Sequence, residues 1–158
     1  IEVYTKNGVK LAATNSGATV TLSSPVSVAT DVWVGIPYTM RYVFSEQLFK
    51  APAEQGKSPS SAANIKIRNG ALYYSDSADF TVKVTPSGRD TYENVFTPDP
   101  VTSETLGAVN IDSGFFRFPI LSKPKDTEIV IESSSALPCH FTNAEFESFV
   151  HSRSNRYG

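Results

Sequence analysis

Residues 79–85 read Asp-Phe-Thr-Val-Lys-Val-Thr, and this alternation of apolar and polar side chains decides the fold class. Alternation with a period of two is typical of a β-strand that buries one face. Residues 115–121, Phe-Phe-Arg-Phe-Pro-Ile-Leu, give a second strand whose even positions face one way. The side chains predicted to lie on the buried faces are Phe80, Val82, Val84, Phe116, Phe118 and Ile120.

Shorter runs of the same kind occupy most of the remaining chain. We expect strands at residues 1–5, 9–13, 18–22, 32–36, 38–44, 64–74, 91–97, 106–111 and 127–133. Turns are expected at Asn7-Gly8 and at residues 15–17, because Asn and Gly tolerate positive φ. Residues 142–152 fit either a strand or a short capped helix, and their aromatic and β-branched content favours the strand. The pattern predicts an all-β, antiparallel domain with long loops, either a β-sandwich or jelly-roll-like.

Three local features refine this prediction. The apolar run Val32–Ile36 is expected to be covered on both faces, and Tyr38–Phe44 to be a core strand carrying four large side chains on one face. The strand at residues 64–74 is expected to be long, with a bulge or kink at Asn69-Gly70. Residues 112–114, Asp-Ser-Gly, are expected to form a turn between two strands.

The length of 158 residues corresponds to one domain. Because the chain opens inside an alternating pattern, we expect residues 1–158 to be a fragment of a longer protein. Residues 1–30 are then a β-meander of this domain or the last strands of a preceding module. Residues 51–63 contain no periodic signal and are predicted to be a flexible loop.

The loop prediction has a direct test. Ordering a residue costs about 1–2 kcal/mol in backbone entropy, and residues 51–63 have no large apolar side chain to offset that cost. Limited proteolysis followed by mass spectrometry should therefore cut first near Lys57. First cleavage inside residues 64–85 would contradict the loop assignment.

Composition and charge exclude several classes of function. With 14 basic and 16 acidic residues, the net charge of −2 gives no overall attraction to nucleic acid or to anionic lipid. One cysteine excludes an internal disulfide and a cysteine-rich metal site. No apolar stretch approaches the ~20 residues that span a bilayer, so we expect no membrane insertion.

Candidate catalytic residues are few. Cys139 and His140 are adjacent, so on an extended chain they point to opposite faces and cannot form a dyad; a buried structural cysteine is the expected state. Glu145 and Glu147 would share one face of a strand at a glycosidase-like separation, and solvent-facing or interface carboxylates are favoured. Three loop aspartates, Asp99, Asp112 and Asp126, lack calcium-loop spacing. The sequence predicts no enzyme, no metal and no cofactor.

Two groups of residues suggest binding. Trp33, Tyr38 and Tyr73-Tyr74 could form a platform for stacking on sugars, although core packing explains them as well. Arg153 and Arg156 form a locally basic stretch, which is either an arm that docks on a neighbour or a frayed tail. These two arginines and Lys57 are the candidate interface residues.

Several blocks in a fixed order resemble the carboxy-terminal part of the tail-nozzle (tail tubular protein B) family of short-tailed, podovirus-type phages. The similarity spans about residues 31–156. Family members often have Trp-Glu-Gly where this chain has Phe146-Glu147-Ser148. The blocks that carry the resemblance are residues 32–38 with 41–47, 78–84, 114–119, 137–141 and 144–153.

The resemblance implies a structural protein of the virion tail. Nozzle proteins form a six-fold ring below the tail adaptor, and DNA leaves through its channel. The implied partners are other copies of the chain, the adaptor and other tail proteins, with transient, non-specific DNA contact. The alternative is a carbohydrate-binding β-sandwich of a phage adhesin or tail fibre, which exposure of Trp33, Tyr73 or Tyr74 would favour. A glycan hydrolase would need a cleft around Glu145 and Glu147.

Overall fold

The computed structural model describes residues 1–5, 9–27, 31–48, 64–98 and 110–151. The segment 51–63, which contains Lys57, lies outside these residues, as do Arg153 and Arg156. Most of the strand expected at residues 106–111 also lies outside them. What the sequence indicates for these segments stays a prediction.

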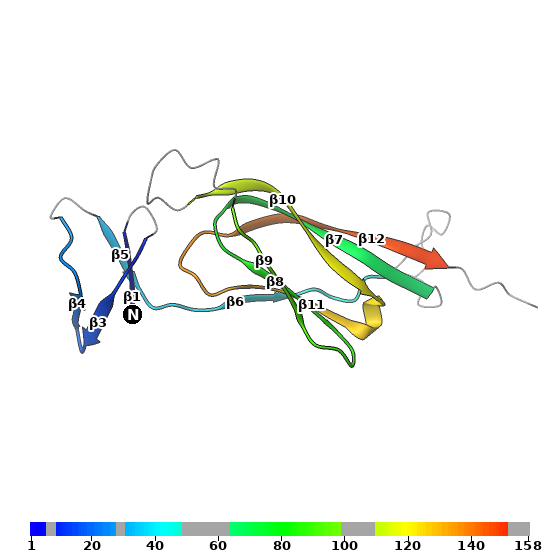
Figure 1. The fold of residues 1–158 in the computed structure, drawn as a ribbon, viewed down its shortest axis with the longest axis horizontal. Coiled ribbons are helices and arrows are strands. Elements are labelled where there is room, and N and C mark those ends of the chain that lie inside the picture. Colours follow the sequence, from blue (N-terminus) through cyan, green and yellow to red (C-terminus); the bar gives the residue numbers. More distant parts are fainter. Residues whose placement is uncertain (6–8, 28–30, 49–63, 99–109, 152–158) are drawn as a thin grey trace, which may run out of the picture.

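Two antiparallel sheets pack face to face and form the predicted sandwich (Figure 1). The first sheet has the order β10-β7-β12, formed by Asp112–Ser122, Asn64–Ser77 and His140–His151. The second has the order β6-β11-β8-β9, formed by Met40–Val43, Thr127–Ser133, Thr81–Pro86 and Tyr92–Val95. A short 3-10 helix, η2 (Pro124–Asp126), follows β10. Each pairing among the described strands is antiparallel, which confirms the predicted fold class.

The core lies between these two sheets. Val82 and Val84 of β8 are completely buried, and Phe118 of β10 is 1% exposed, as the alternation predicts. Within the core the rings of Phe80 and Phe96 stack with their centroids 4.4 Å apart. Other core side chains come from β7 and β11, so the two sheets share one apolar interior: Ile67, Leu72, Tyr74, Ile129 and Ile131.

Strand β7 is the long, irregular strand that the sequence predicts, but its bulge lies at Arg68, one position before Asn69-Gly70. Asn69 pairs with Glu147 and Ile67 with Ser148, so Arg68 is the extra residue of β7 opposite β12. Opposite β10 the extra residue lies on β10 itself, where Leu121 has a φ of 50°. Gly70 has a different role. A Cβ atom at Gly70 would lie 2.3 Å from Cζ of Phe118, so the missing side chain provides the space that this ring occupies.

The turn expected at residues 112–114 is absent from the described structure, because these residues begin β10. A second irregularity places them in the ladder, where Asp112 pairs with Ser77 and Gly114 with Tyr74. Opposite them, Asp76 adopts a φ of 46°, and its backbone N–H donates to Ser113 Oγ at 2.9 Å. The bulge accommodates the polar triplet without ending the strand.

The carboxy-terminal segment is a strand and not a helix. Strand β12 pairs with β7 from His140 opposite Ser75 to His151 opposite Asn64, along nearly the whole length of β7. The backbone groups of β7 therefore have partners in both β10 and β12. The aromatic and β-branched content of this segment therefore predicted its structure correctly, and the capping pattern at Thr142 did not.

The strands described between residues 2 and 35 form two small sheets that lie beside the sandwich, at one end of the molecule (Figure 1). One sheet has the order β2-β1-β5, formed by Lys10–Leu11, Glu2–Thr5 and Val32–Gly35. The other is the hairpin of β3 (Ala13–Ser16) and β4 (Thr19–Leu22), with Gly17 at a φ of 61° in its turn. The antiparallel pairings of β1 with β2 and of β3 with β4 agree with hairpins at the two expected turns. The second turn lies at residues 17–18 and not at 15–17, because residues 15 and 16 belong to β3, and the turn expected at Asn7-Gly8 lies outside the described residues. That this region ends a preceding module stays a prediction.

Two expectations about residues 32–44 are wrong within this single chain. All four residues of β5 are exposed, although an apolar run was expected to be covered. Tyr38 is exposed and lies before β6, which begins only at Met40. Strand β6 is an edge strand, so Met40 and Phe44 reach the core while Tyr42 stays 55% exposed.

Candidate assembly surface

The most exposed large apolar side chains among the described residues lie in the segment 32–38, which comprises β5 and the beginning of its connection to β6. We call it the 32–38 surface. The exposed fraction is 68% for Trp33, 82% for Ile36 and 79% for Tyr38. The segment contains no charged side chain. Isolated exposed apolar residues are ordinary, whereas several in one continuous stretch are typical of a surface that a partner covers.

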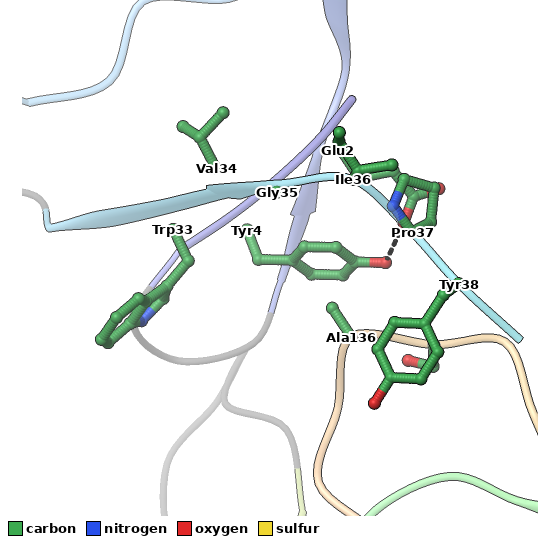
Figure 2. Close-up of a pocket in the computed structure, with 10 residues that line it drawn as sticks. Glu2, Tyr4, Trp33, Val34, Gly35, Ile36, Pro37, Tyr38 and Ala136 are labelled. Atoms are coloured by element: carbon green, nitrogen blue, oxygen red, sulfur yellow. Dashed lines mark hydrogen bonds between the residues drawn. The ribbon is translucent and has the colours of Figure 1, made fainter. Parts of the chain in front are cut away.

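The 32–38 surface borders a hollow of about 140 Å³. Figure 2 shows the ring of Tyr4 between Trp33 and Tyr38, with Ala136 beside the ring of Tyr38. Ala136 belongs to the connection between β11 and β12, so the small sheet and the sandwich both contribute to the hollow. The residues that line it are Glu2, Tyr4, Trp33, Val34, Gly35, Ile36, Pro37, Tyr38, Ser135 and Ala136.

Glu2 is the one charged residue among those ten, and its carboxylate already has two partners. The Tyr4 hydroxyl donates to Glu2 Oε2 at 2.8 Å, and Lys10 Nζ forms an ion pair with Oε1. The hydrogen bond from Lys10 is the largest cause that lowers the pKa of Glu2, followed by that from Tyr4. Burial, and then the hydrogen bond to Glu2, raises the pKa of Tyr4. The hollow therefore offers a ligand mostly apolar surface.

We expect Glu2→Gln to destabilise the small sheet near neutral pH and to have less effect in acid. Folding lowers the pKa of Glu2 below its ordinary 4.5, so the ionised carboxylate contributes stability above that pH. This contribution is lost as the pH falls through the lowered pKa of the folded state. Urea unfolding at about pH 7 and about pH 3 measures the difference. The control is Glu46→Gln at an exposed position; a Glu2→Gln effect that persists in acid would contradict the assignment.

Strand β5 also has an unpaired edge within the described structure. It is the last strand of its sheet and pairs only with β1, from Val32 opposite Thr5 to Gly35 opposite Glu2. Pro37 lies two residues after the end of β5, and proline has no N–H to continue a ladder. Natural edge strands are usually protected by charges, bulges or a covering segment. An apolar, uncharged edge is suited to receiving a partner.

The catalytic candidates of the sequence do not form a site. Cys139 is partly buried, and burial is the largest cause that raises the pKa of its thiol, whereas His140 is exposed. Glu145 and Glu147 are exposed on β12 and already accept hydrogen bonds. The Tyr73 hydroxyl donates to Glu145 Oε2 at 3.1 Å, and Asn69 Nδ2 donates to Glu147 Oε2 at 3.2 Å.

The aspartates behave as structural groups where they are described. Asp112 accepts a hydrogen bond from the Tyr74 hydroxyl at 3.1 Å, and burial together with this bond raises the pKa of Tyr74 to about 12. Asp126 ends η2, while Asp99 lies outside the described residues. Within the described ranges, no group of three acidic, histidine or cysteine side chains could hold a metal ion. The same ranges include no helix with the length and apolar character of a membrane span.

The aromatic candidates divide into two groups. Tyr73 is partly buried on the outer face of β7, where its ring lies 6.0 Å from that of Phe115 and outside the core cluster. Tyr74 is 8% exposed within the core, so the packing interpretation holds for this ring. For Trp33 and Tyr38 it is wrong, because both rings are exposed at the hollow. The signal that could have located Trp33 is Pro37, which separates its strand from the core strand that follows; Tyr38 lies after this proline and has no such signal.

A ladder of ion pairs crosses β6, β11, β8 and β9 of the sandwich. Arg41 lies 3.3 Å from Glu128 and 3.4 Å from Glu132. Lys83 Nζ lies 2.7 Å from Glu132 Oε2 and 3.4 Å from Glu93. The hydrogen bond from Lys83 is the largest cause that lowers the pKa of Glu132. Two basic groups therefore face three carboxylates, and both are already paired.

Comparison of the sequence with known proteins adds one positive finding. The profile of a family described as "Bacteriophage nozzle protein" matches residues 2–157, almost the entire chain. No curated protein matches the chain.

Proposed function

Because the chain belongs to the bacteriophage nozzle protein family, we propose that it forms part of a homo-oligomeric ring through which viral DNA is ejected. Family membership makes it a structural component of the virion tail that assembles with other tail proteins. The proposed ring is a hexamer in the complete protein, and its role is structural and not enzymatic. It would contact the tail adaptor and, transiently, the passing DNA.

The 32–38 surface is the observation that supports an assembly role. Covering a large apolar side chain stabilises a contact by about 1.5–3 kcal/mol when the side chain is fully buried. Trp33, Ile36 and Tyr38 together therefore offer a substantial driving force for association. Arg153, Arg156 and Lys57 remain proposed interface residues, outside the described part of the chain.

The test is the mass of the protein expressed from its complete gene, measured by native mass spectrometry and light scattering. We expect a closed ring of identical copies at micromolar concentration. The 158-residue chain measured beside it shows whether this part assembles by itself. A complete protein that stays monomeric over the whole concentration range would contradict the proposal.

We expect that neither the chain nor the ring binds duplex DNA tightly at physiological salt. Each phosphate neutralised by a basic side chain adds affinity through counterion release, which would hold a duplex that must slide. In the ladder, Arg41 and Lys83 are already paired with carboxylates, so they are poor phosphate ligands. Fluorescence anisotropy at about 0.15 M salt measures this. Submicromolar affinity with a steep salt dependence would indicate a protein that grips DNA.

The carbohydrate-binding alternative has one observation in its favour, the exposure of Trp33 beside the hollow. A sugar also needs polar groups for its hydroxyls, and here the Glu2 carboxylate is already bound by Tyr4 and Lys10. A protein partner therefore fits this surface better. A glycan array probed with the complete protein and with Trp33→Ala tests the alternative, which requires binding that this substitution abolishes.

A further inference from the structure

We infer that strand β5 receives an extended segment of a different tail protein, which pairs with its free edge as a fourth strand of the small sheet. One large apolar side chain of that segment lies in the hollow. This inference rests on the proposed function, in which the chain assembles with other tail proteins, and it names how one of them binds. The partner is identified by its chemistry, as an uncharged β-strand with a bulky apolar side chain.

The backbone of β5 supplies the first argument. Val32–Gly35 pairs with β1 on one side only, so within the described structure no strand lies beside its other edge. The outward-facing N–H and C=O groups of an edge strand are a template for a further strand. Adding a strand to such an edge is a recurring way of binding a peptide, because backbone hydrogen bonds give affinity and side chains give specificity.

The side chains of β5 supply the second argument. All four residues of the strand are exposed, so neither of its faces is covered. Trp33 and Val34 point to opposite faces and are 68% and 56% exposed. A partner surface laid over one face would leave the other apolar side chain in water. An added strand carries side chains on both faces, so its cross-strand pairs can cover both.

The hollow selects the side chain of the partner. Its volume of about 140 Å³ is below the ~300–1,000 Å³ of most small-molecule sites, so it suits one side chain better than a free ligand. Gly35 lines the hollow, and a Cβ atom there would meet nothing within 4 Å, so the space beside the strand is open at this residue. The rings of Tyr4 and Tyr38 line the same space (Figure 2). Because the Glu2 carboxylate already has its partners, an apolar side chain fits best.

The strands of a second copy fit this edge less well. Among the described strands with a free edge, β2, β6, β9, β10 and β12 each contain a charged residue, and β3 and β4 expose no large apolar side chain. Of the described strands, β5 alone has the required character. Pairing β5 with β5 would join two copies about a two-fold axis, and such a contact closes after two copies instead of repeating around the proposed ring. We therefore assign the added strand to another protein.

Hydrogen exchange followed by mass spectrometry tests the added strand, in the complete protein in solution and in purified tails. The amides of residues 32–35 that point away from β1 should exchange at least about tenfold more slowly in tails, because their N–H groups gain partners. Ile36→Asp should lower the yield of complete tails at least about tenfold, since the contact would bury an unpaired carboxylate. Its rings should still form. Val95→Asp is the matched control, because Val95 is 59% exposed on β9, outside the 32–38 surface.

Photo-crosslinking in the same tails identifies the partner. The photoreactive residue p-benzoylphenylalanine replaces Ile36 in one preparation and Val95 in the control preparation, and the cross-linked peptides are sequenced by mass spectrometry. From position 36 we expect a peptide of a different tail protein, with an uncharged run at least about as long as the four residues of β5. Position 95 should not give this product. Circular dichroism establishes that each variant is folded, and the exchange measurement on the wild type does not depend on any variant.

Several results would overturn the inference and leave the ring in place. They are unchanged exchange of residues 32–35 in complete tails, a cross-link from position 36 to another copy of this chain or to a charged segment, and no cross-link from position 36. Equal losses of tails in Ile36→Asp and Val95→Asp would overturn it as well. A complete protein that forms no ring, or tails that lack the protein, would instead contradict the proposed function.

Discussion

Replacing Phe118 with alanine is expected to lower the free energy of unfolding by about 3–5 kcal/mol, the range for truncating a buried aromatic side chain. Phe118 is 1% exposed and belongs to the core cluster between the two sheets. Its ring also lies directly over Gly70 of β7. The truncated side chain would leave a cavity in the sandwich that neighbouring strands, held by their ladders, cannot easily fill.

Denaturant and thermal unfolding measure this effect, and Phe115→Ala is the control on the same strand. Phe115 is 56% exposed on the opposite face, against Tyr73 and Arg117, so its loss should cost about 1 kcal/mol or less. If the two variants exchanged their effects, β10 would be out of register by one residue, because such a slip exchanges the faces of a strand.

The second large effect is expected for Gly70→Ala, at about 1–3 kcal/mol of lost stability, which is typical of overpacking. The new Cβ would lie 2.3, 2.6 and 2.9 Å from three ring carbons of Phe118. That ring is enclosed in the core, so the strands must move apart. The matched control is Gly35→Ala, because a Cβ there meets nothing within 4 Å. Restricting the unfolded backbone favours alanine at both positions, so similar losses in both variants would show that the cost at Gly70 does not come from contact with the ring.

A double mutant isolates the contact between these two positions. In the Phe118→Ala background the ring is absent, so Gly70→Ala should cost much less than it does in the wild type. The free energies of unfolding would then be non-additive, as is usual for residues in contact. Additive losses would contradict the close approach of Gly70 and the ring.

The strands of the sandwich could be predicted from the sequence because their alternation is intrinsic to them. Residues 79–85 and 115–121 bury the expected faces, since an extended chain with one apolar side has few other stable arrangements. The strand at residues 112–114 could not be predicted in this way. Asp-Ser-Gly is a good turn sequence, and it stays in β10 only because a bulge of β7 at Ser75-Asp76 accommodates it, which is a tertiary effect.

The candidate site could be predicted only in part. The sequence indicated Trp33 and Tyr38 as possible binding residues, but burial in the core was the favoured interpretation for both. An apolar run gives the same signal whether its cover is the same chain or another one, so composition cannot distinguish β5 from a buried strand. The hollow at Tyr4 and Ala136 could not be foreseen, because it joins segments far apart in the sequence.

The position of β7 between β10 and β12 has a consequence for how the protein is made. Tyr73 of β7 donates a hydrogen bond to Glu145 of β12, which is 72 residues later. Pairing between such distant segments folds slowly, because a long loop must close before any contact forms. During synthesis, β7 leaves the ribosome before β10 and well before β12 exists, so neither of its edges has a partner at first. The three-stranded sheet can be completed only after residues 140–151 have emerged. Until then, the exposed strand edges can pair with other nascent chains translated from the same mRNA.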